Sequence, residues 1–347
     1  FHNALTLRGA KARDTLRWAE VIDEVLVKYG DKSDLVFASH HWPTWGGENV
    51  ERFLRSQRDV YRYAHDQTLR QANGGATMVE AAEALVEPDL GDDVFDTRGY
   101  YGTLNHNAKA IYQFYFGWWD GVPATYHTLP PVERASRMVE AVGGADEAIT
   151  KGRSAFAEGD YRWAAELFNA VVFDDPDNRD GREWLAATYE QLGFQAESGA
   201  WRSYYLTGAK ELRDGIPEGS GANLGNEDFL KAVPTAALFN ALAVRYQPDA
   251  MKRDPYTLNF RFTDTDEQVM VEVGGATVFP RYGASADDAA ATFETTRESF
   301  NDLILGKTGA ARLALAGKLS VTGDRGAASA FFDALEQPET DFNVVTP

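Results

Sequence analysis

Hydrophobic positions in the first two thirds of the chain recur at the spacing of an α-helix. The pattern predicts long helices over residues 11–29 and 48–72, a short helix with a capping box over 77–85, and further helices over 105–119 and 132–142. This part of the chain is therefore expected to be mainly helical.

Residues 34–38 show a different pattern, a short apolar run that predicts one buried strand. A buried strand needs hydrogen-bond partners on both sides, yet the residues that follow look helical and offer none. We therefore expect residues 1–47 to be the end of a larger α/β domain whose front part is missing from this chain.

Beyond a stretch rich in glycine at 214–228, apolar and polar residues alternate with a period of two. This change predicts one helical domain over 48–215, a linker over 216–227 and a small α+β domain over 228–347. The elements expected in the last domain are strands over 256–262, 269–273, 276–280 and 318–322 and helices over 286–304 and 327–335.

Residues 145–178 have the residue spacing of a tetratricopeptide repeat. The matching positions are Gly152, Gly159, Tyr161, Ala164, Phe168 and Pro176. Small residues let two helices cross closely, aromatic residues fill the gap, and the proline ends the second helix. A second copy starts about 34 residues later with Tyr189 and Gly193 and then degrades. Since a free solenoid needs about three repeats, we expect TPR-like helix pairs that form one patch of a larger helical domain, such as an oligomer contact.

Composition narrows the classes of function. The chain has 347 residues and a formal net charge of −19, and it has no cluster of lysine and arginine, which argues against a nucleic-acid partner. No apolar run approaches the roughly 18 residues of a membrane-spanning helix. The sequence contains no cysteine, which excludes disulfides and thiolate metal sites and suits an oxidising compartment.

Two of the six histidines, His40 and His41, come directly after the predicted strand. Ligands gather at the carboxyl ends of strands in α/β sheets, and the tryptophans, proline and glycine that follow suggest a fixed loop. Neutral imidazole is a common metal ligand. We expect this pair to bind a metal or to act in acid–base chemistry. The alternative is that each is a core histidine bonded to the backbone.

Four long motifs resemble one known family. They are FHNALTLRGAK at the start, FASHHWPTWG at 37–46, YRYAHDQTLRQANGG at 61–75 and RGYYGTLNHNAKAIYQFYFGWWDG at 98–121. Together they resemble the alkylsulfatases of the metallo-β-lactamase superfamily, over essentially the whole chain. The resemblance implies the end of an αββα metallo-β-lactamase catalytic domain at 1–47, a helical dimerisation domain at 48–215 and a sterol-carrier-like domain at 228–347.

The same resemblance implies two zinc ions and the hydrolysis of alkyl sulfate esters such as dodecyl sulfate. The main metal ligands of the family lie in a His-x-His-x-Asp-His motif and at two later acidic residues, none of which occurs here. His40 falls where the superfamily supplies a late metal histidine, so we expect His40 to bind metal. Its neighbour His41 should face the other way and is either a catalytic group beside the metal or the alternative ligand. One or two histidines are too few for two zinc ions, so this chain alone is expected to be inactive.

A sulfate monoester also needs cations and hydrogen-bond donors around its oxygens. The residues that the resemblance and this chemistry indicate are Asn3, Arg8, Arg98, Tyr101, His106 and Asn107. Arginine offers a planar fork for oxyanions, and a helix start such as that at His106 favours an anion. The alternatives are surface ion pairs for the arginines and a cap or core hydrogen bond for His106 and Asn107.

Aromatic residues are candidates for binding an alkyl tail. Trp42, Trp45 and Tyr126 are expected to line an apolar channel, whereas the aromatic belt at 112–119 is expected mainly to pack in the core. A sheet that is covered on one face is enough to explain the alternating apolar residues of the last domain, although a sterol-carrier-like fold can also hold a lipid or detergent tail.

The expected partners are an alkyl sulfate substrate, a second copy of the chain bound through the helical domain, and the missing N-terminal portion. The expected location is the periplasm or the exterior of the cell. Two other functions stay open: a non-catalytic TPR-like scaffold joined to a lipid-binding domain, and another esterase of the superfamily that acts on phosphate esters or lactones. Convergence of His40, His106 and Arg8 on one cleft would favour the sulfatase.

Overall fold

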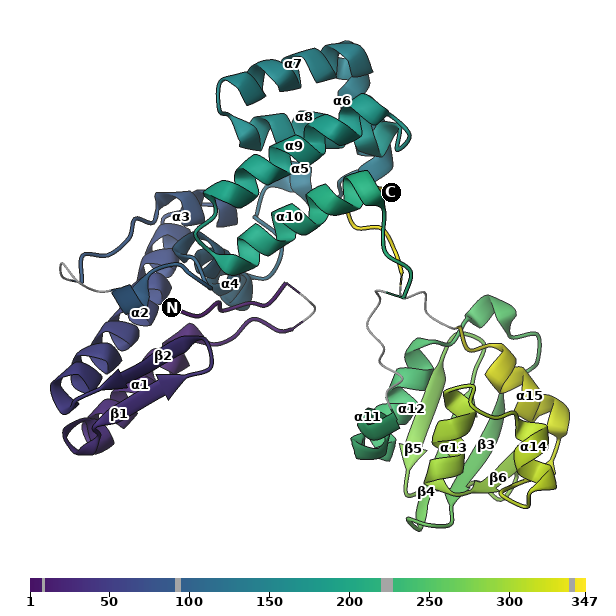
Figure 1. Ribbon diagram of the computed structural model, residues 1–347. Coiled ribbons are helices and arrows are strands. Elements are labelled where there is room, and N and C mark those ends of the chain that lie inside the picture. Colours follow the sequence, from purple (N-terminus) through teal and green to yellow (C-terminus); the bar gives the residue numbers. More distant parts are fainter. Residues whose placement is uncertain (8–9, 91–94, 220–226, 337–340) are drawn as a thin grey trace. The chain divides into compact units, whose positions relative to one another are not determined.

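The computed structural model describes residues 1–7, 10–90, 95–219, 227–336 and 341–347 (Figure 1). The chain divides into two compact units, one formed by Phe1–Gly215 with Asn343–Pro347 and the other by Ile216–Phe342. The last five residues thus belong to the first unit and not to the C-terminal domain in which the sequence pattern placed them. No helix among the described residues is both long and apolar enough to cross a membrane.

The first unit starts with two helices that pack along each other, α1 (Thr15–Tyr29) and α2 (Gly47–Asn73). Apolar side chains join them at both ends: Leu26 lies with Val50 and Phe53, and Ala19 lies with Val60. A 3-10 turn, η1 (Gly30–Lys32), and a β-hairpin separate the two helices. These contacts confirm the two helices that the apolar spacing predicts.

The hairpin consists of β1 (Leu35–Ala38) and β2 (His41–Trp45), paired antiparallel. Two expectations are therefore wrong: residues 41–45 are a strand and not a loop, and the first strand is not buried. Leu35 is 46% exposed and Phe37 is 74% exposed. Because β2 supplies the backbone partners of β1 on one edge, the hairpin forms without a strand on its other edge.

Short helices cover the middle of the first unit. They are α3 (Met78–Ala84), η2 (Phe95–Thr97), α4 (Leu104–Phe116), α5 (Pro123–Tyr126) and α6 (Pro131–Val142). The predicted capping box of α3 is present between Thr77 and Glu80. Helix α4 ends three residues earlier than predicted because Gly117 has a φ of +82°, a conformation that side-chain-bearing residues rarely adopt. The sequence pattern placed the aromatics of 112–119 mainly in the core, and the structure contradicts this for all of them but Tyr112.

Four helices complete the unit as antiparallel neighbours (Figure 1): α7 (Ala145–Ala157), α8 (Tyr161–Asp174), α9 (Arg179–Gln195) and α10 (Gly199–Asp214). Small residues stand where helices cross, as the repeat pattern predicts. A Cβ on Gly152 would lie 2.6 Å from Phe168 Cε1, and one on Gly193 would lie 2.9 Å from Leu206 Cδ2. A Cβ at Gly152 would force the buried ring of Phe168 to move, whereas at Gly193 it would displace only the end of the Leu206 side chain.

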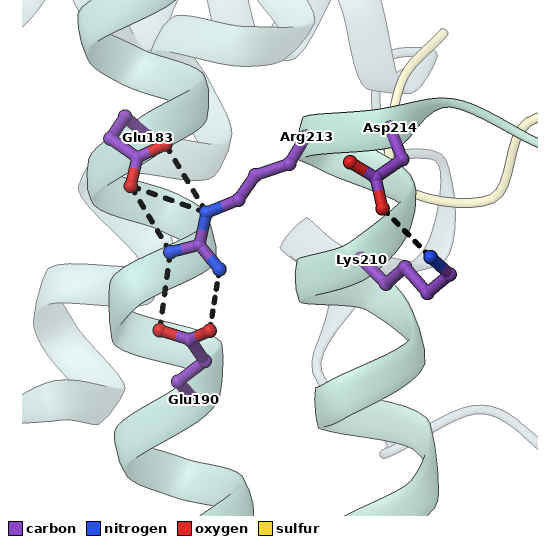
Figure 2. A network of polar contacts seen from close by, with 5 residues as sticks. All are labelled: Glu183, Glu190, Lys210, Arg213 and Asp214. Carbon is purple, nitrogen blue, oxygen red and sulfur yellow. Dashed lines mark hydrogen bonds and ion pairs between the residues drawn. The ribbon is translucent and has the colours of Figure 1, made fainter.

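Charged residues join α9 to α10 on the surface (Figure 2). The guanidinium of Arg213 on α10 bonds Glu183 at 3.1 Å and Glu190 at 2.5 Å, both on α9. Beside them, Lys210 pairs with Asp214 at 2.7 Å within α10. The hydrogen bond from Arg213, assisted by its charge, lowers the pKa of the Glu190 carboxyl. Since the Arg213 pairs lie at the surface, each adds only about 0–1 kcal/mol, and they mainly fix how α9 and α10 lie against each other.

The returning tail completes the same pair of helices. The backbone N–H groups of Val344 and Val345 donate to Glu211 Oε1 on α10 at 2.7 and 3.0 Å. The side chain of Val345 packs on the core of the helical unit, beside Gly208 and Tyr189. The tail is thus held by hydrogen bonds and by apolar contact.

The second unit is a five-stranded sheet with helices. Its strands are β3 (Tyr256–Phe262), β4 (Glu267–Val273), β5 (Val278–Tyr282), β6 (Ala291–Thr295) and β7 (Leu319–Gly323). Its helical segments are α11 (Glu227–Ala232), α12 (Thr235–Val244), η3 (Pro248–Ala250), α13 (Arg297–Ile304), α14 (Ala310–Leu315) and α15 (Arg325–Asp333). The strand order is β5-β4-β3-β6-β7, with β3 and β6 parallel and the other neighbours antiparallel.

Phenylalanines form the centre of this second core. Phe239 of α12, Phe260 and Phe262 of β3, Phe300 of α13 and Phe331 of α15 are each at most 2% exposed. The period-two pattern predicts β3 and β4 correctly.

The helix expected over 286–304 is wrong in its first half, where β6 lies. Residues Ala291, Phe293 and Thr295 alternate into the core there, and the helix starts only after Thr296 caps it by accepting from Ser299 N.

Candidate functional site

Residues 1–7 lie along the start of α4, which holds them through one asparagine. Asn107 accepts a hydrogen bond from Ala4 N at 2.7 Å and donates one to His2 O at 2.9 Å. Gly102 approaches the same segment so closely that a Cβ would stand 2.5 Å from the His2 carbonyl. Asn107 is fully buried, so both halves of its amide serve this attachment.

His106 supports the same segment from the next position. Its Nε2 lies 2.7 Å from Leu5 O, and its Nδ1 accepts from Trp201 Nε1 at 3.3 Å. Because the indole can only donate, Nδ1 carries no proton and Nε2 donates to Leu5. Burial lowers the pKa of His106, which favours this neutral form.

A small cavity of about 100 Å³ opens beside this segment. Its lining consists of Phe1, His2, Ala38, Ser39, His40, His41, Phe53, Gln57, Tyr61, Asp96, Tyr100 and Tyr101. The ring of His40 stacks on Tyr101 with centroids 4.3 Å apart and planes at 15°. The ring of His2 lies 5.0 Å from His40 and 4.7 Å from Tyr101. Three polar rings from three separate segments therefore meet at one point.

Arg13 brings a positive charge to this cluster. Its Nη1 donates to Asn3 O at 2.8 Å and to Asn3 Oδ1 at 3.3 Å, and it lies 3.3 Å from His2 Nδ1. The guanidinium also stands over Trp18, 5.7 Å from the ring centroid. Burial, assisted by the Arg13 charge, lowers the pKa of His2. Burial raises the pKa of Tyr61, whose hydroxyl accepts from His2 N, to about 12.

The two adjacent histidines point to different neighbours. His40 lies in the turn of the hairpin and contacts Tyr101, whereas His41 opens β2 and stacks on Phe53 at 5.6 Å. The two rings thus have different neighbours, although both histidines line the same cavity. The described residues hold no group of three or more histidine, cysteine or acidic side chains that could bind a metal ion. Alone, this part of the chain does not fit a site for two zinc ions, so no reaction step is assigned to a metal here.

The residues that the sequence indicated differ in their relation to the cavity. Tyr101, His40 and His41 line it. Asn3 lies in the segment of residues 1–7 that borders the cavity, and His106 and Asn107 hold that segment through hydrogen bonds. Arg98 and Trp45 do not line the cavity: Arg98 pairs with Glu197 at 2.5 Å. The surface ion pair weighed for Arg98 is thus what the structure contains, and Trp42 stacks on Phe95 outside the lining. Arg8 lies outside the described residues.

The second unit contains a larger cavity of about 830 Å³ between its sheet and helices α12–α15. Its lining is mostly apolar and includes Leu242, Phe293, Leu303, Ile304, Leu319, Val321, Phe332 and Leu335. Two arginines, Arg245 and Arg325, also line it, whereas no acidic residue of the described part of the chain does. Burial lowers the pKa of Arg245, which nevertheless stays charged near neutral pH.

Comparison with known proteins places both units in one family. The model described as alkyl sulfatase dimerisation matches residues 77–215, and the model described as alkyl sulfatase C-terminal matches residues 223–347. The chain belongs to the alkyl sulfatase family through these two domains. The resemblance inferred from the four motifs is therefore confirmed, as is a helical dimerisation domain followed by an α+β domain.

Individual relatives agree with this alkyl sulfatase assignment. A linear primary-alkylsulfatase of Pseudomonas sp is 41% identical over 346 residues, which cover 100% of this chain and 51% of that protein. The alkyl/aryl-sulfatase BDS1 of Saccharomyces cerevisiae is 36% identical over 346 residues, covering 100% of this chain and 53% of that protein. The solved stereoselective inverting sec-alkylsulfatase Pisa1 from Pseudomonas sp. matches with a TM-score of 0.94 at 36% identity, covering 100% of this chain and 55% of that one. The chain spans about half the length of the curated relatives it matches.

Sequence reasoning missed His2, which lines the cavity, and Arg13, which contacts His2 and Asn3 beside it. His2 reads as a structural or surface residue, but its ring faces His40 and Tyr101. The signal that could have identified His2 was its position next to Asn3 in the first motif, FHNALTLRGAK. Arg13 carried no signal of its own, because its role depends on contacts with residues that precede it by 10 and 11 positions.

Proposed function

We propose that this chain is part of an enzyme that hydrolyses alkyl sulfate esters to an alcohol and sulfate. The observation that supports this most directly is the meeting of His40, Tyr101 and His2 at one cavity, in a chain whose whole length matches alkylsulfatases. His40 is exposed and free to reach a ligand, whereas a structural histidine would be enclosed.

The chemistry of the cavity suits a monoanionic ester. Imidazole and phenol groups can donate hydrogen bonds to sulfate oxygens, and Arg13 keeps a positive charge next to Asn3 and His2. His106 and Asn107 act by position, since their polar atoms hold the segment that carries Asn3. Their direct contact with substrate stays a prediction, as do the roles of Arg8, Arg98, Trp42 and Trp45.

We further propose that His40 is this chain's contribution to a zinc site completed by residues outside the chain, with His41 beside it. Zinc would supply a Lewis acid and a metal-bound water of lowered pKa. This assignment rests on the family motif and on the exposed position of His40 in the hairpin turn.

The C-terminal cavity is proposed to hold the alkyl tail of a substrate. Its volume of about 830 Å³ exceeds that of a twelve-carbon chain, and burying each CH₂ contributes about 0.8 kcal/mol. Arg245 and Arg325 would favour an anionic head group over a neutral one. The dimerisation domain supports a homodimer of the complete protein.

Sulfate release from dodecyl sulfate tests the proposed activity, using the full natural polypeptide that contains this chain. We expect hydrolysis of the sulfate ester, far slower cleavage of dodecyl phosphate, and none by residues 1–347 alone. His40→Ala should lower kcat at least about 100-fold, since a metal-site ligand or a group at the reacting centre contributes several kcal/mol.

Two comparisons make this test specific. His127→Asn changes an exposed histidine that does not line the cavity and should leave kcat within about twofold. Zinc content measured on the His40→Ala protein should fall if His40 is a ligand. Equal activity of wild type and His40→Ala would refute the assignment of the cavity as the active site.

A further inference from the structure

The side chain of Arg13 makes its polar contacts with the segment that borders the small cavity. Its Nη1 donates to Asn3 O at 2.8 Å and to Asn3 Oδ1 at 3.3 Å, and it lies 3.3 Å from His2 Nδ1. Within the described part of the chain, Arg13 forms no ion pair, although the sequence has 53 acidic residues. Arg17, four positions later, pairs with two glutamates at 3.2 and 3.0 Å. The positive charge of Arg13 is thus held beside His2 and Asn3 and is not spent on a surface carboxylate.

The main chain of Arg13 holds the same segment. Arg13 N donates to Ala4 O at 2.8 Å, so the backbone and the side chain of one residue bind two consecutive residues, Ala4 and Asn3. The next residue, Asp14, caps helix α1 by accepting from Arg17 N. Because Arg13 directly precedes a capped helix, a rigid element fixes its backbone, and groups held by rigid elements are placed more precisely than groups on loops.

Trp18 of α1 holds the guanidinium in place. Cζ of Arg13 stands 5.7 Å from the centroid of the Trp18 ring. The same ring meets His2 edge-on at 5.9 Å and Tyr61 edge-on at 5.0 Å. A cation over an aromatic face is attracted by the ring, and a planar guanidinium that is already oriented loses less freedom for each hydrogen bond it forms. Arg13 and His2 are therefore fixed against one common support before any ligand binds.

These contacts decide which polar atoms of His2 and Asn3 stay available. Asn3 O can only accept, so His2 Nδ1, 3.0 Å away, carries a proton and donates to it. Arg13 Nη1 lies close to Nδ1 because both donate to this one oxygen, and Nη1 also occupies Asn3 Oδ1. The remaining side-chain nitrogens, His2 Nε2 and Asn3 Nδ2, have no hydrogen-bond partner among the described residues. Each side chain thus keeps one polar atom for a ligand.

We propose that Arg13 is a positioning residue for the sulfate ester, which fixes Asn3 directly and the ring of His2 through the Asn3 carbonyl. The inference rests on the sulfatase function proposed above and adds to it a residue that acts without touching the substrate. Polar groups that are aimed before the substrate arrives need no reorganisation as charge develops in the transition state. A displacement of about 1 Å can lower a rate about 100-fold, so the loss of Arg13 should be felt at the reacting centre.

Sulfate release from dodecyl sulfate by the full natural polypeptide tests this role. We expect Arg13→Ala to lower kcat at least about 100-fold and to raise KM no more than about tenfold, because orientation matters more in the transition state than in the bound ground state. Arg17→Ala is the matched control, since it removes an exposed arginine that does not line the cavity, and it should keep kcat within about twofold. A wild-type kcat for Arg13→Ala, or a loss confined to KM, would overturn the proposal.

Chemical rescue separates positioning from a general loss of folding. Guanidinium chloride at about 50 mM should raise the kcat of Arg13→Ala at least about tenfold, because the free ion can take the place over Trp18, whereas sodium chloride at equal ionic strength should not. A misfolded protein would gain nothing, since guanidinium weakens folded structure. A folded Arg13→Ala protein that guanidinium does not activate would contradict the proposal.

Arg13→Lys provides a second variant that keeps the charge over Trp18. Its shorter side chain ends in a single ammonium and cannot reach both oxygens of Asn3 as the guanidinium does, so kcat should still fall at least about tenfold. Circular dichroism and the unfolding temperature should match the wild type. If Arg13→Lys were folded and as active as the wild type, the exact placement of Asn3 would not matter and the proposal would fail.

Binding of inorganic sulfate, measured by titration calorimetry, separates this inference from the proposed function. The sulfate dissociation constant should rise about three- to tenfold in Arg13→Ala and stay unchanged in Arg17→Ala. If the wild type cleaves dodecyl sulfate and Arg13→Ala cleaves it equally well, the sulfatase proposal stands and the role of Arg13 falls. If the wild type cleaves no sulfate ester but binds sulfate more tightly than Arg13→Ala does, the sulfatase proposal falls and the positioning of an anion by Arg13 stands. A wild type that neither cleaves the ester nor binds sulfate refutes both.

Discussion

His106 illustrates how a histidine that looks catalytic in a motif can act by position. Both ring nitrogens have partners inside the chain, Leu5 O and Trp201 Nε1, and the ring is 9% exposed. Lys109 adds a positive charge that, after burial, also lowers the pKa of His106. The ring is therefore held in its neutral form, and a proton taken up at acid pH would remove the acceptor that Trp201 uses.

The pH dependence of stability follows from this lowered pKa. Between the folded pKa and the ordinary value near 6.5, the unfolded chain binds a proton that the folded chain does not, so stability is full above pH 6.5 and falls as the pH drops. His106→Gln keeps a donor for Leu5 but cannot titrate. We expect it to lose about 1 kcal/mol at pH 7.5 and to show a shallower slope between pH 7.5 and 5.5 in urea unfolding.

Gln195→Asn, an exposed change at the end of α9 that adds and removes no titratable group, gives the control and should keep the slope of the wild type. A His106→Gln protein with the full wild-type slope would show that other groups produce the pH dependence. Part of the slope should persist in any case, because His2 is also partly buried with a lowered pKa.

Single residues of the site were predictable to the extent that a motif marked them. His40 and Tyr101 were found because two motifs carry them, and the stacking of their rings gives those motifs a structural meaning. His2 and Arg13 were not found, because their contacts depend on how residues 1–7 lie along α4 and beside Arg13. Spacing along a sequence does not encode such a path.

At the scale of elements, the crossing of α7 and α8 depends on a missing side chain. Gly152 Cα faces Phe168, which is fully buried, and an added Cβ would lie 2.6–2.7 Å from two ring carbons. Alanine in a helix interior is favoured over glycine by up to about 1 kcal/mol, but overpacking of a filled core destabilises by about 1–3 kcal/mol. The cost of overpacking should therefore exceed the gain in helix propensity.

We expect Gly152→Ala to lower the free energy of unfolding of the helical unit by about 1–2 kcal/mol, measured by chemical denaturation. Adding Phe168→Leu should recover part of this loss, because the smaller side chain makes room for the Cβ. Gly47→Ala at the start of α2 is the control: its nearest contact would be 3.8 Å away, and its stability should not fall. If Gly152→Ala were as stable as the wild type, α7 and α8 could move apart without loss of stability, and the close approach at Gly152 would not be required.

Periodicity predicted elements well where a pattern ran long and failed where it was short. Helices α1 and α2 and strands β3 and β4 were found from their apolar spacing. Strand β6 was missed because five residues inside an alanine-rich run alternate too briefly to outweigh a helical reading. Strand β2 was missed because proline and two tryptophans favoured a loop, although an exposed hairpin edge tolerates proline.

At the scale of the whole molecule, the two compact units have separate cores. A ligand that binds only one unit should therefore stabilise that unit alone. Octyl sulfate held in the C-terminal cavity at about ten times its dissociation constant should add about 1.4 kcal/mol to the second unit. We expect its unfolding transition in calorimetry to rise by about 3–6 °C, while the transition of the helical unit stays in place.

Two comparisons test the role of charge in that cavity. Octanol should stabilise less than octyl sulfate in the wild type, and Arg245→Gln should remove most of the difference. Arg261→Gln, on β3 and outside the cavity lining, should behave as wild type. A shift of both transitions together, or an equal response to octanol and octyl sulfate, would contradict selective binding of an anionic head group.

The path of the tail decides the order in which the helical unit can be finished. Val344 and Val345 take their places on α10 only after the ribosome has made the entire α+β unit that precedes them. Until then Glu211 accepts no hydrogen bonds from the backbone of the tail, and the side chain of Val345 does not yet cover Gly208. The α+β unit is thus an insertion in the helical one, and the helical unit, although it is begun before the α+β unit, is completed after it.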